Sequence, residues 1–466
     1  MTGQWSVVVC VFLCVFTLCF GFSPSSRTAV INQRHRGPNT NGIQCQAQTQ
    51  SASVIPPAPA ASDETDWDLW FTLPIAPYSR RKTFMEEVVP GKIWTFDQAQ
   101  GILYVIVPVR MTVVKLEGGG LFVHAPVAPT KECIKMVRAL EEEHGPVKQI
   151  VLPTLGLEHK VFAGPFAQKF PQAEVWVTPG QYSFPLNLPL SFLGFGARKI
   201  NVLPREGAKG TPWEGEMEHA VLGPFVAKSG IGAFGETTFF HRATGTIMVT
   251  DVVVKVTPKI PKIVDEDPRS MLFHSRDNTF QGVQDTPAVR AKGWRRITQF
   301  ALTFQPGSLD VLPLGQALKD GKKSPAKDLG WGGLFPFEWT RDDSPTVKAL
   351  SNGLLCAPIL QVLILNRNPV EVAEWLDIVT SWSFNRVIPC HLQNNVKATP
   401  QEFRAAFDYL REEASAKPQG LVGLFQKPKP SKAPLPDADL ELLRGAEELL
   451  VSQGTLFPAE PKLPAQ

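Results

Sequence analysis

The sequence predicts a layered α/β protein, in which helices cover the outer faces of β-sheets. Three observations support this: β-branched and aromatic runs dominate residues 93–123, strand and helix patterns alternate from 123 to 203, and two paired strands at 236–254 precede further helices. The 466 residues, 43% hydrophobic and 20% charged, are enough for one large or two medium domains. A chain that is disordered throughout is excluded.

The first 80 residues are predicted to carry targeting signals. Residues 7–22 form an apolar run of signal-peptide length, although the six residues before it contain no Lys or Arg, and we assign residues 1–22 to a signal peptide. No acidic residue precedes Asp63, whereas 44 Asp and Glu in 466 residues would place about six there on average. Because transit peptides lack acidic residues, residues 23–80 are predicted to be a transit peptide and a disordered linker.

These two segments resemble the bipartite presequences of algae with secondary plastids, and they predict a chloroplast (plastid) location. The alternative is a signal peptide followed by a disordered secretory linker. The three cysteines beyond the leader and its linker, Cys133, Cys356 and Cys390, are far apart and fit a reducing compartment better than a disulfide scaffold.

Charge and hydropathy exclude two classes of partner. With 47 Lys and Arg against 44 Asp and Glu, the net charge of +3 provides no basic field for nucleic acid. Residues 354–365 are the most apolar stretch after the leader, but Pro358 and Gln361 interrupt them, so a core or interface helix is favoured. No membrane span is therefore expected in the mature chain.

The elements of the body follow from hydrophobic periodicity. Strands are predicted within 93–123 and at 149–152, 173–178, 199–203, 236–242, 246–254 and 386–389. Helices are predicted at 130–144, 161–170, 346–365, 370–381 and 400–412. Residues 255–345 are expected to be a long irregular insertion, and residues 421–466 a Pro-rich linker followed by a short docking helix at 437–451.

Polar residues that could perform chemistry follow three of the predicted strands. The first is the strand end that runs from Leu152 to Glu158-His159. The second is Thr250-Asp251, towards the close of the strand predicted at 246–254, and the third is Pro389-Cys390-His391. Loops at strand ends are positioned by a rigid sheet, and binding and catalytic residues are often found there. These three segments are therefore the candidate site.

This order of elements resembles the metallo-beta-lactamase-like hydrolase superfamily, which implies an αββα sandwich with metal ligands at these strand ends. In that superfamily the first loop contains His-x-His-x-Asp-His, and here Thr154, Gly156, Glu158 and His159 stand at those positions. The first two histidines are thus replaced. The resemblance therefore predicts an αββα sandwich of metallo-beta-lactamase type with a degenerate metal site.

Longer phrases resemble an uncharacterised family of cyanobacteria and plastids within this superfamily, the domain of unknown function 4336. They are VPVRMTVVKL, GGLFVHAPVAPT, LEHKVFAGPFAQKFPQAEVWVTPGQ, FFHRATGTIMVTD and GLLCAPILQVLILNRNP. The family domain is expected to span residues 84–420, with the insertion around 255–345. The resemblance implies a fold and suggests a compartment, but it supplies no substrate.

The resemblance also implies the ligands. Four residues align with one of the two metal positions and with the bridging carboxylate of the superfamily: Glu158, His159, Asp251 and His391. These four side chains suffice to bind one zinc, iron or manganese ion. The third histidine of the other position has no counterpart, because Gly235-Glu236 lies there. Asp251 and Glu158 are the candidate catalytic residues, since a carboxylate that does not bind the ion could act as general base.

Each candidate residue also has a purely structural interpretation. His159 could cap a helix, Asp251 could close a turn, and His391 could be a core histidine. His241 is more typical of a core histidine, and His124 is either a substitute ligand or part of the packing.

Two functional hypotheses follow. The first is a mononuclear metal-dependent hydrolase of a small ester, thioester or lactone. The second is a non-catalytic binding or scaffold protein that retained the fold, for which the partner would be another protein instead of a small-molecule substrate. An iron-dependent oxidoreductase ranks third, because its di-iron site would require the missing histidines.

Overall fold

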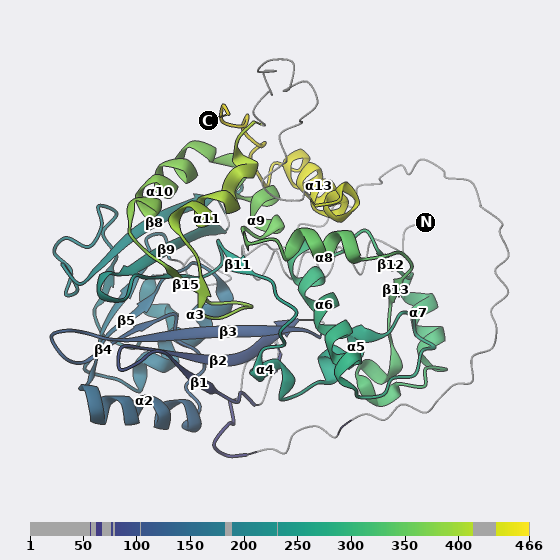
Figure 1. The fold of residues 1–466 in the computed structure, drawn as a ribbon, viewed down its shortest axis with the longest axis horizontal. Helices are drawn as coiled ribbons and strands as arrows, with labels where there is room; N and C mark the ends of the chain where they lie inside the picture. The colour runs from purple at the N-terminus through teal and green to yellow at the C-terminus, as the bar shows by residue number, and fades with distance from the viewer. Residues whose placement is uncertain are drawn as a thin grey trace, which may run out of the picture.

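The computed structural model describes residues 56, 62–67, 76–77, 80–102, 104–181, 189–230, 232–412 and 435–465. The predicted signal peptide, most of the predicted transit segment and most of the Pro-rich linker lie outside these residues. Within them, two β-sheets pack face to face with helices on both outer sides (Figure 1). The predicted αββα sandwich is confirmed.

The first sheet has seven strands in the order of the sequence. Strands β1 to β4 form an antiparallel meander, and β4 to β7 run parallel. Helix α2 (Lys131–His144) connects β4 to β5, and α3 (Leu157–Gln168) connects β5 to β6. The strands are β1 (Phe84–Val89), β2 (Ile93–Ile102), β3 (Val105–Lys115), β4 (Leu121–His124), β5 (Val147–Leu152), β6 (Glu174–Val177) and β7 (Ile200–Val202).

The second sheet has five strands in the order β16, β15, β10, β9, β8. Strands β10 and β15 are parallel, and the other neighbours are antiparallel. The strands are β8 (Met217–Val226), β9 (Ala233–His241), β10 (Thr246–Val249), β15 (Arg386–Pro389) and β16 (Val396–Lys397). The sequence pattern did not predict β8, in which Gly223 and Pro224 interrupt the alternation.

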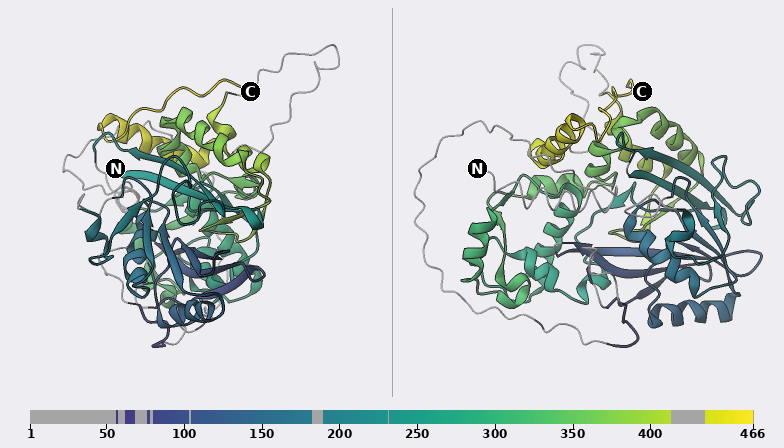
Figure 2. Two further views of the ribbon diagram at one scale, coloured as in Figure 1. Left: turned by 90° about the vertical axis from the view of Figure 1, so that its left-hand side faces the viewer. Right: turned by 180° about the vertical axis from the view of Figure 1, so that it is seen from behind.

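Three apolar layers hold the sandwich together. Between the sheets, side chains such as Phe122, Phe239 and Ile388 interdigitate around the buried Trp213. Helices α2 and α3 cover the outer face of the first sheet. Helices α10 (Pro369–Ser381) and α11 (Pro400–Arg404) cover the second sheet, and a 3-10 helix continues α11 (Figure 2). Each sheet is therefore buried on both faces, as the apolar strand patterns require.

The insertion at 255–345 contains four complete α-helices and the start of a fifth, joined by loops, so the expectation of an irregular segment was wrong in part. Helix α6 begins after Thr286, whose hydroxyl accepts the Val289 N–H, and it buries apolar residues at helical spacing. Its buried face also contains Arg296 and Gln299, which obscures the apolar period in the sequence. The other elements are α4 (Lys262–Asp265), α5 (Arg269–Ser275), α6 (Pro287–Thr303), β12 (Leu309–Val311), α7 (Leu314–Gly321), β13 (Phe337–Trp339) and α8 (Ser344–Leu350).

The helix predicted at 346–365 is interrupted. After α8 the chain forms β14 (Leu354–Leu355), which pairs with β11 (Val254–Lys255), and then α9 (Pro358–Leu363). Gly353 adopts a φ of 86° and Pro358 starts a new helix, so one continuous helix is impossible here.

The C-terminal docking helix is confirmed as α13 (Asp437–Ser452), which packs against α9 and α6 and buries Leu443 and Leu450. No helix among the described residues is both long and apolar enough to cross a membrane.

Candidate metal centre

Four side chains from three strand ends meet at one edge of the sandwich. Glu158 and His159 lie in the first turn of α3, which begins four residues earlier than predicted. The parallel register pairs Val249 with Pro389, so residues two positions further along each strand, Asp251 and His391, lie side by side. The candidate ligand atoms of the four residues all lie within 4.8 Å of one another. The structure thus brings together all four residues that the sequence singled out.

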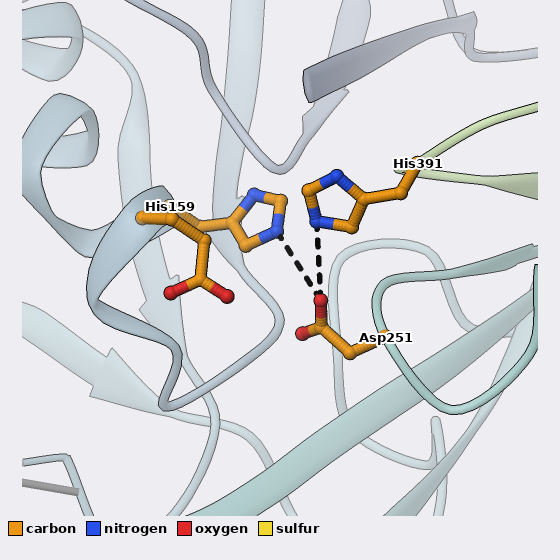
Figure 3. Close-up of side chains that lie close together, drawn as sticks. His159, Asp251 and His391 are labelled. Atoms are coloured by element: carbon orange, nitrogen blue, oxygen red, sulfur yellow. Dashed lines mark ion pairs between the residues drawn. The ribbon is translucent and has the colours of Figure 1, made fainter. Parts of the chain in front are cut away.

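Asp251 lies between the two imidazoles (Figure 3). Its Oδ1 is 3.2 Å from Nε2 of His391 and 3.9 Å from Nε2 of His159. The carboxylate of Glu158 folds back over Gly156, where an added Cβ would lie only 2.9 Å from Oε1. The absence of a side chain at 156 therefore leaves room for this carboxylate.

The orientation of His391 is determined by its surroundings. Its Nδ1 lies 2.9 Å from the carbonyl oxygen of Pro108 and therefore donates to it, which leaves Nε2 facing Asp251. The loop that carries His391 is held by Arg110, which donates to the carbonyls of Pro389 (2.5 Å) and Leu392 (3.2 Å). Metal-binding histidines typically donate the second ring N–H in this way.

His159 has no hydrogen-bonding role inside the fold. Its side chain is fully buried, and neither ring nitrogen has a hydrogen-bond partner among the residues that the structure describes. It does not cap α3, whose first residue follows Gly156 without a side-chain cap. The carboxylate of Asp251, at 3.9 Å, is too distant to form a hydrogen bond with Nε2, and a ligand bond would remove the cost of burying an imidazole that makes no hydrogen bond.

The donor set fits a divalent transition metal. Two imidazoles and two carboxylates are usual ligands of zinc, iron and manganese. Ligand bonds of about 2.1 Å allow ligand atoms to lie up to roughly 4.2 Å apart. Since the separations here do not exceed 4.8 Å, small side-chain movements would complete the coordination.

The electrostatics favour one ionised carboxylate at the centre. Burial alone would raise the pKa of Asp251, but His159 and His391 outweigh it and lower that pKa. Burial and then the charge of Asp251 raise the pKa of Glu158. His391 would lose basicity through burial, but Asp251 raises its pKa. Asp251 is therefore the stable negative charge of the site.

Glu236 belongs to the site although sequence analysis did not select it. It lies on β9, is fully buried, and accepts the backbone N–H groups of residues 250–252. These bonds show that the turn is closed by Glu236 and not by Asp251. Burial and then the charge of Asp251 raise the pKa of Glu236 to about 7. The sequence feature that could have identified Glu236 is an acidic residue inside a strand whose other residues are uncharged and buried.

The two other histidines that the sequence analysis considered, His241 and His124, lie outside the group of four. His241 is buried and shares a 2.8 Å hydrogen bond between Nδ1 and Thr244 Oγ1, so it is structural, as expected. His124 is also buried, and its ring packs edge-on against Phe239. Burial and then the proximity of His159 lower the pKa of His124 to about 3. This imidazole is accordingly neutral.

The fold and site define an αββα sandwich protein with a four-residue group that could hold a metal ion. The chain belongs to the family "Domain of unknown function (DUF4336)", which matches residues 90–409. No curated protein matches the chain.

Solved structures of similar fold share little sequence with the chain. The metal-soaked Flv1 flavodiiron core from Synechocystis sp. PCC6803 is 8% identical with a TM-score of 0.36, over 71% of this chain and 60% of that one. A flavoprotein from Thermotoga maritima is 10% identical with a TM-score of 0.36, over 71% and 61%. The metallo-beta-lactamase from Pontibacter korlensis is 12% identical with a TM-score of 0.28, over 47% and 99%. The chain thus spans about 60% of the flavodiiron core.

Proposed function

We propose that this protein is a mononuclear metal-dependent hydrolase of a small ester, thioester or lactone. The observation that carries the proposal is the convergence of Glu158, His159, Asp251 and His391 within 4.8 Å. Asp251 and His391 are 16% and 17% exposed, so a small substrate can reach one side of the group. His159 is buried and closes the other side.

The residues have distinct tasks in this proposal. His159 and His391 would hold an ion through their imidazoles, and Asp251 would supply the anionic ligand. A bound divalent ion supplies Lewis acidity, which lowers the pKa of water and polarises a carbonyl group. Glu158 accepts a proton at its carboxylate when it is not a ligand, because its raised pKa brings it closer to the working pH.

Metal content tests this proposal. The full chain, purified without added metal, is compared by elemental mass spectrometry with His159→Ala and His391→Ala variants. We expect about one equivalent of zinc, iron or manganese in the parent chain and a loss in both variants. His144→Gln is the matched control, since His144 ends α2 and is not one of the four candidate ligands. A parent chain that binds none of these ions when they are supplied would contradict the proposal.

A binding or scaffold protein is the second candidate. Thr154 and Gly156 replace two ligand positions, and the Thr154 hydroxyl instead donates to Asp251 Oδ2 at 3.3 Å. In this case the same purification retains no metal, and the four side chains have no catalytic task. The two candidates are therefore separated by one measurement.

We further propose a plastid location, on the basis of the acid-free segment before Asp63 and the apolar run at 7–22. Residues 1–80 fused to a fluorescent protein would direct it to the plastid. Secretion of the fusion would support the alternative of a signal peptide alone.

A further inference from the structure

The carboxylate of Glu236 is a central hydrogen-bond acceptor beneath the candidate metal centre. Its Oε1 accepts the Thr250 N–H at 2.7 Å, and its Oε2 accepts those of Asp251 at 2.7 Å and Val252 at 3.0 Å. The residue is fully buried on β9. Three consecutive backbone N–H groups after β10 therefore converge on one side chain.

Glu236 also lies where the two sheets meet. The N–H of Leu155 donates to the carbonyl of Gly235 (2.9 Å), and that of Thr237 donates to the carbonyl of Pro153 (2.7 Å). These bonds join β9 to the loop that leads into α3, whose first turn contains Glu158 and His159. Glu236 thus connects the loop of Asp251 with the loop of the other two ligands.

We propose that Glu236 is a positioning residue that holds Asp251 between His159 and His391 and restricts the centre to a single ion. This inference rests on the proposed metal-binding function. Backbone N–H groups occupy three of the roughly four lone-pair sites of the Glu236 carboxylate, so little acceptor capacity remains for a second cation. The carboxylate of Glu236 binds the backbone N–H groups of the loop. The side chain of Asp251 remains directed at the two imidazoles (Figure 3).

A role in packing alone does not explain a carboxylate at this position. A buried acid close to the charge of Asp251 is electrostatically unfavourable, and an apolar side chain would avoid that repulsion. The three N–H groups offset the repulsion and need an acceptor with two oxygens. Glutamine has the same size but only one acceptor oxygen, so its amide NH₂ would face at least one of the three N–H groups, that of Thr250 when the oxygen accepts from Asp251 and Val252.

Metal affinity measures the positioning role. The dissociation constant for Zn²⁺ is determined by competition with a coloured chelator, for the full chain and for Glu236→Gln. Loss of a group that orients a ligand typically weakens metal binding tenfold to a hundredfold, and we expect a change in this range. Glu132→Gln is the matched control, because Glu132 also accepts a backbone N–H, from Thr83 at 2.7 Å, but lies on α2 outside the centre.

A spectroscopic signature separates positioning from general stability. With Co²⁺ as the probe, the visible absorption of the bound ion should change in Glu236→Gln and remain unchanged in Glu132→Gln. Equal Zn²⁺ affinities for the full chain and Glu236→Gln would overturn the inference while leaving the proposed function intact.

The number of metal ions bound per chain tests the restriction to one ion. This measurement needs no variant, so it can be made even if Glu236→Gln does not fold. Native mass spectrometry of the full chain in excess Zn²⁺ should show one retained ion. Two retained ions would overturn the inference but still agree with metal binding. A chain that retains none overturns the proposed function itself.

Discussion

Gly156 and His124 show how single residues shape the candidate centre. At Gly156, a missing side chain leaves space for the carboxylate of Glu158. At His124, a neutral imidazole with no hydrogen-bond partner is enclosed next to the centre. Both effects concern one side chain and its immediate neighbours, and both are open to single substitutions.

Gly156→Ala is expected to weaken Zn²⁺ binding several-fold without loss of stability. The φ of −56° suits alanine, so the backbone is not strained, but the new Cβ would lie 2.9 Å from Glu158 Oε1 and displace it. Chelator competition and thermal unfolding measure the two effects. Gly118→Ala, where an added Cβ meets nothing within 4 Å, should change neither quantity. An unchanged affinity in Gly156→Ala would argue against Glu158 as a ligand.

His124 should make the fold less stable as the pH falls. Its pKa is about 3 in the folded chain and near 6.5 when unfolded, so only the unfolded state gains a proton between these values. The contribution is complete above pH 6.5, and about 2 kcal/mol of it is lost at pH 5. Urea unfolding at pH 7.5 and 5 should therefore show a smaller decrease in His124→Phe than in the parent chain. Equal decreases would mean that His124 is protonated in the fold.

At the scale of secondary-structure elements, one buried arginine of the first sheet, Arg110, also binds the second sheet near His391. Arg110 on β3 is 1% exposed and binds both oxygens of Asp97 on β2, at 2.6 and 2.8 Å. The same guanidinium donates to the carbonyls of Pro389 and Leu392, at the end of β15. The first sheet thereby fixes the end of the strand from which His391 projects.

Arg110→Met is expected to lower the free energy of unfolding by about 3 kcal/mol, because it leaves Asp97 without its partner. The double variant Arg110→Met/Asp97→Leu should recover part of this stability, since no unpaired charge remains. It should not recover the Zn²⁺ affinity, because the carbonyls beside His391 still lack their donor. Full recovery of affinity in the double variant would show that Arg110 acts on stability alone.

For the whole molecule, the helical insertion and the C-terminal helix form a unit beside the sandwich (Figure 2). Asp439 on α13 is 1% exposed and links this unit together. It accepts the Gly307 N–H at 2.6 Å and the Thr346 hydroxyl at 2.7 Å, from two other parts of the unit. None of these residues lies in the group of four at the candidate centre.

Asp439→Ala is therefore expected to reduce stability without changing the metal centre. One buried donor, the Thr346 hydroxyl, and one partly buried donor, the Gly307 N–H, would lose their acceptor, at a cost of about 2 to 4 kcal/mol. Urea unfolding measures this cost, and chelator competition should return the Zn²⁺ affinity of the parent chain. A parallel loss of affinity would show that the unit supports the centre directly.

Local sequence was sufficient to predict those elements whose signals lie within a few residues. The strand at 386–389 was predicted with its observed bounds, because its apolar residues are flanked by polar ones. The four candidate ligands could be selected from the sequence for a related reason, because each lies at or after the end of an apolar strand pattern. They are Glu158, His159, Asp251 and His391. The helices of the insertion could not be predicted from local sequence, because buried polar residues interrupt the apolar period of α6.

The supporting residues of the centre depend on tertiary structure. Arg110 and the Pro389 carbonyl that it binds are 279 positions apart, and no local pattern connects them. Glu236 could not be recognised as an acceptor, because its three donors are brought to it only when β9 and β10 pair. From the sequence alone, a charged side chain is predicted to lie at the surface. Only the folded chain supplies the hydrogen-bond partners that make its burial favourable.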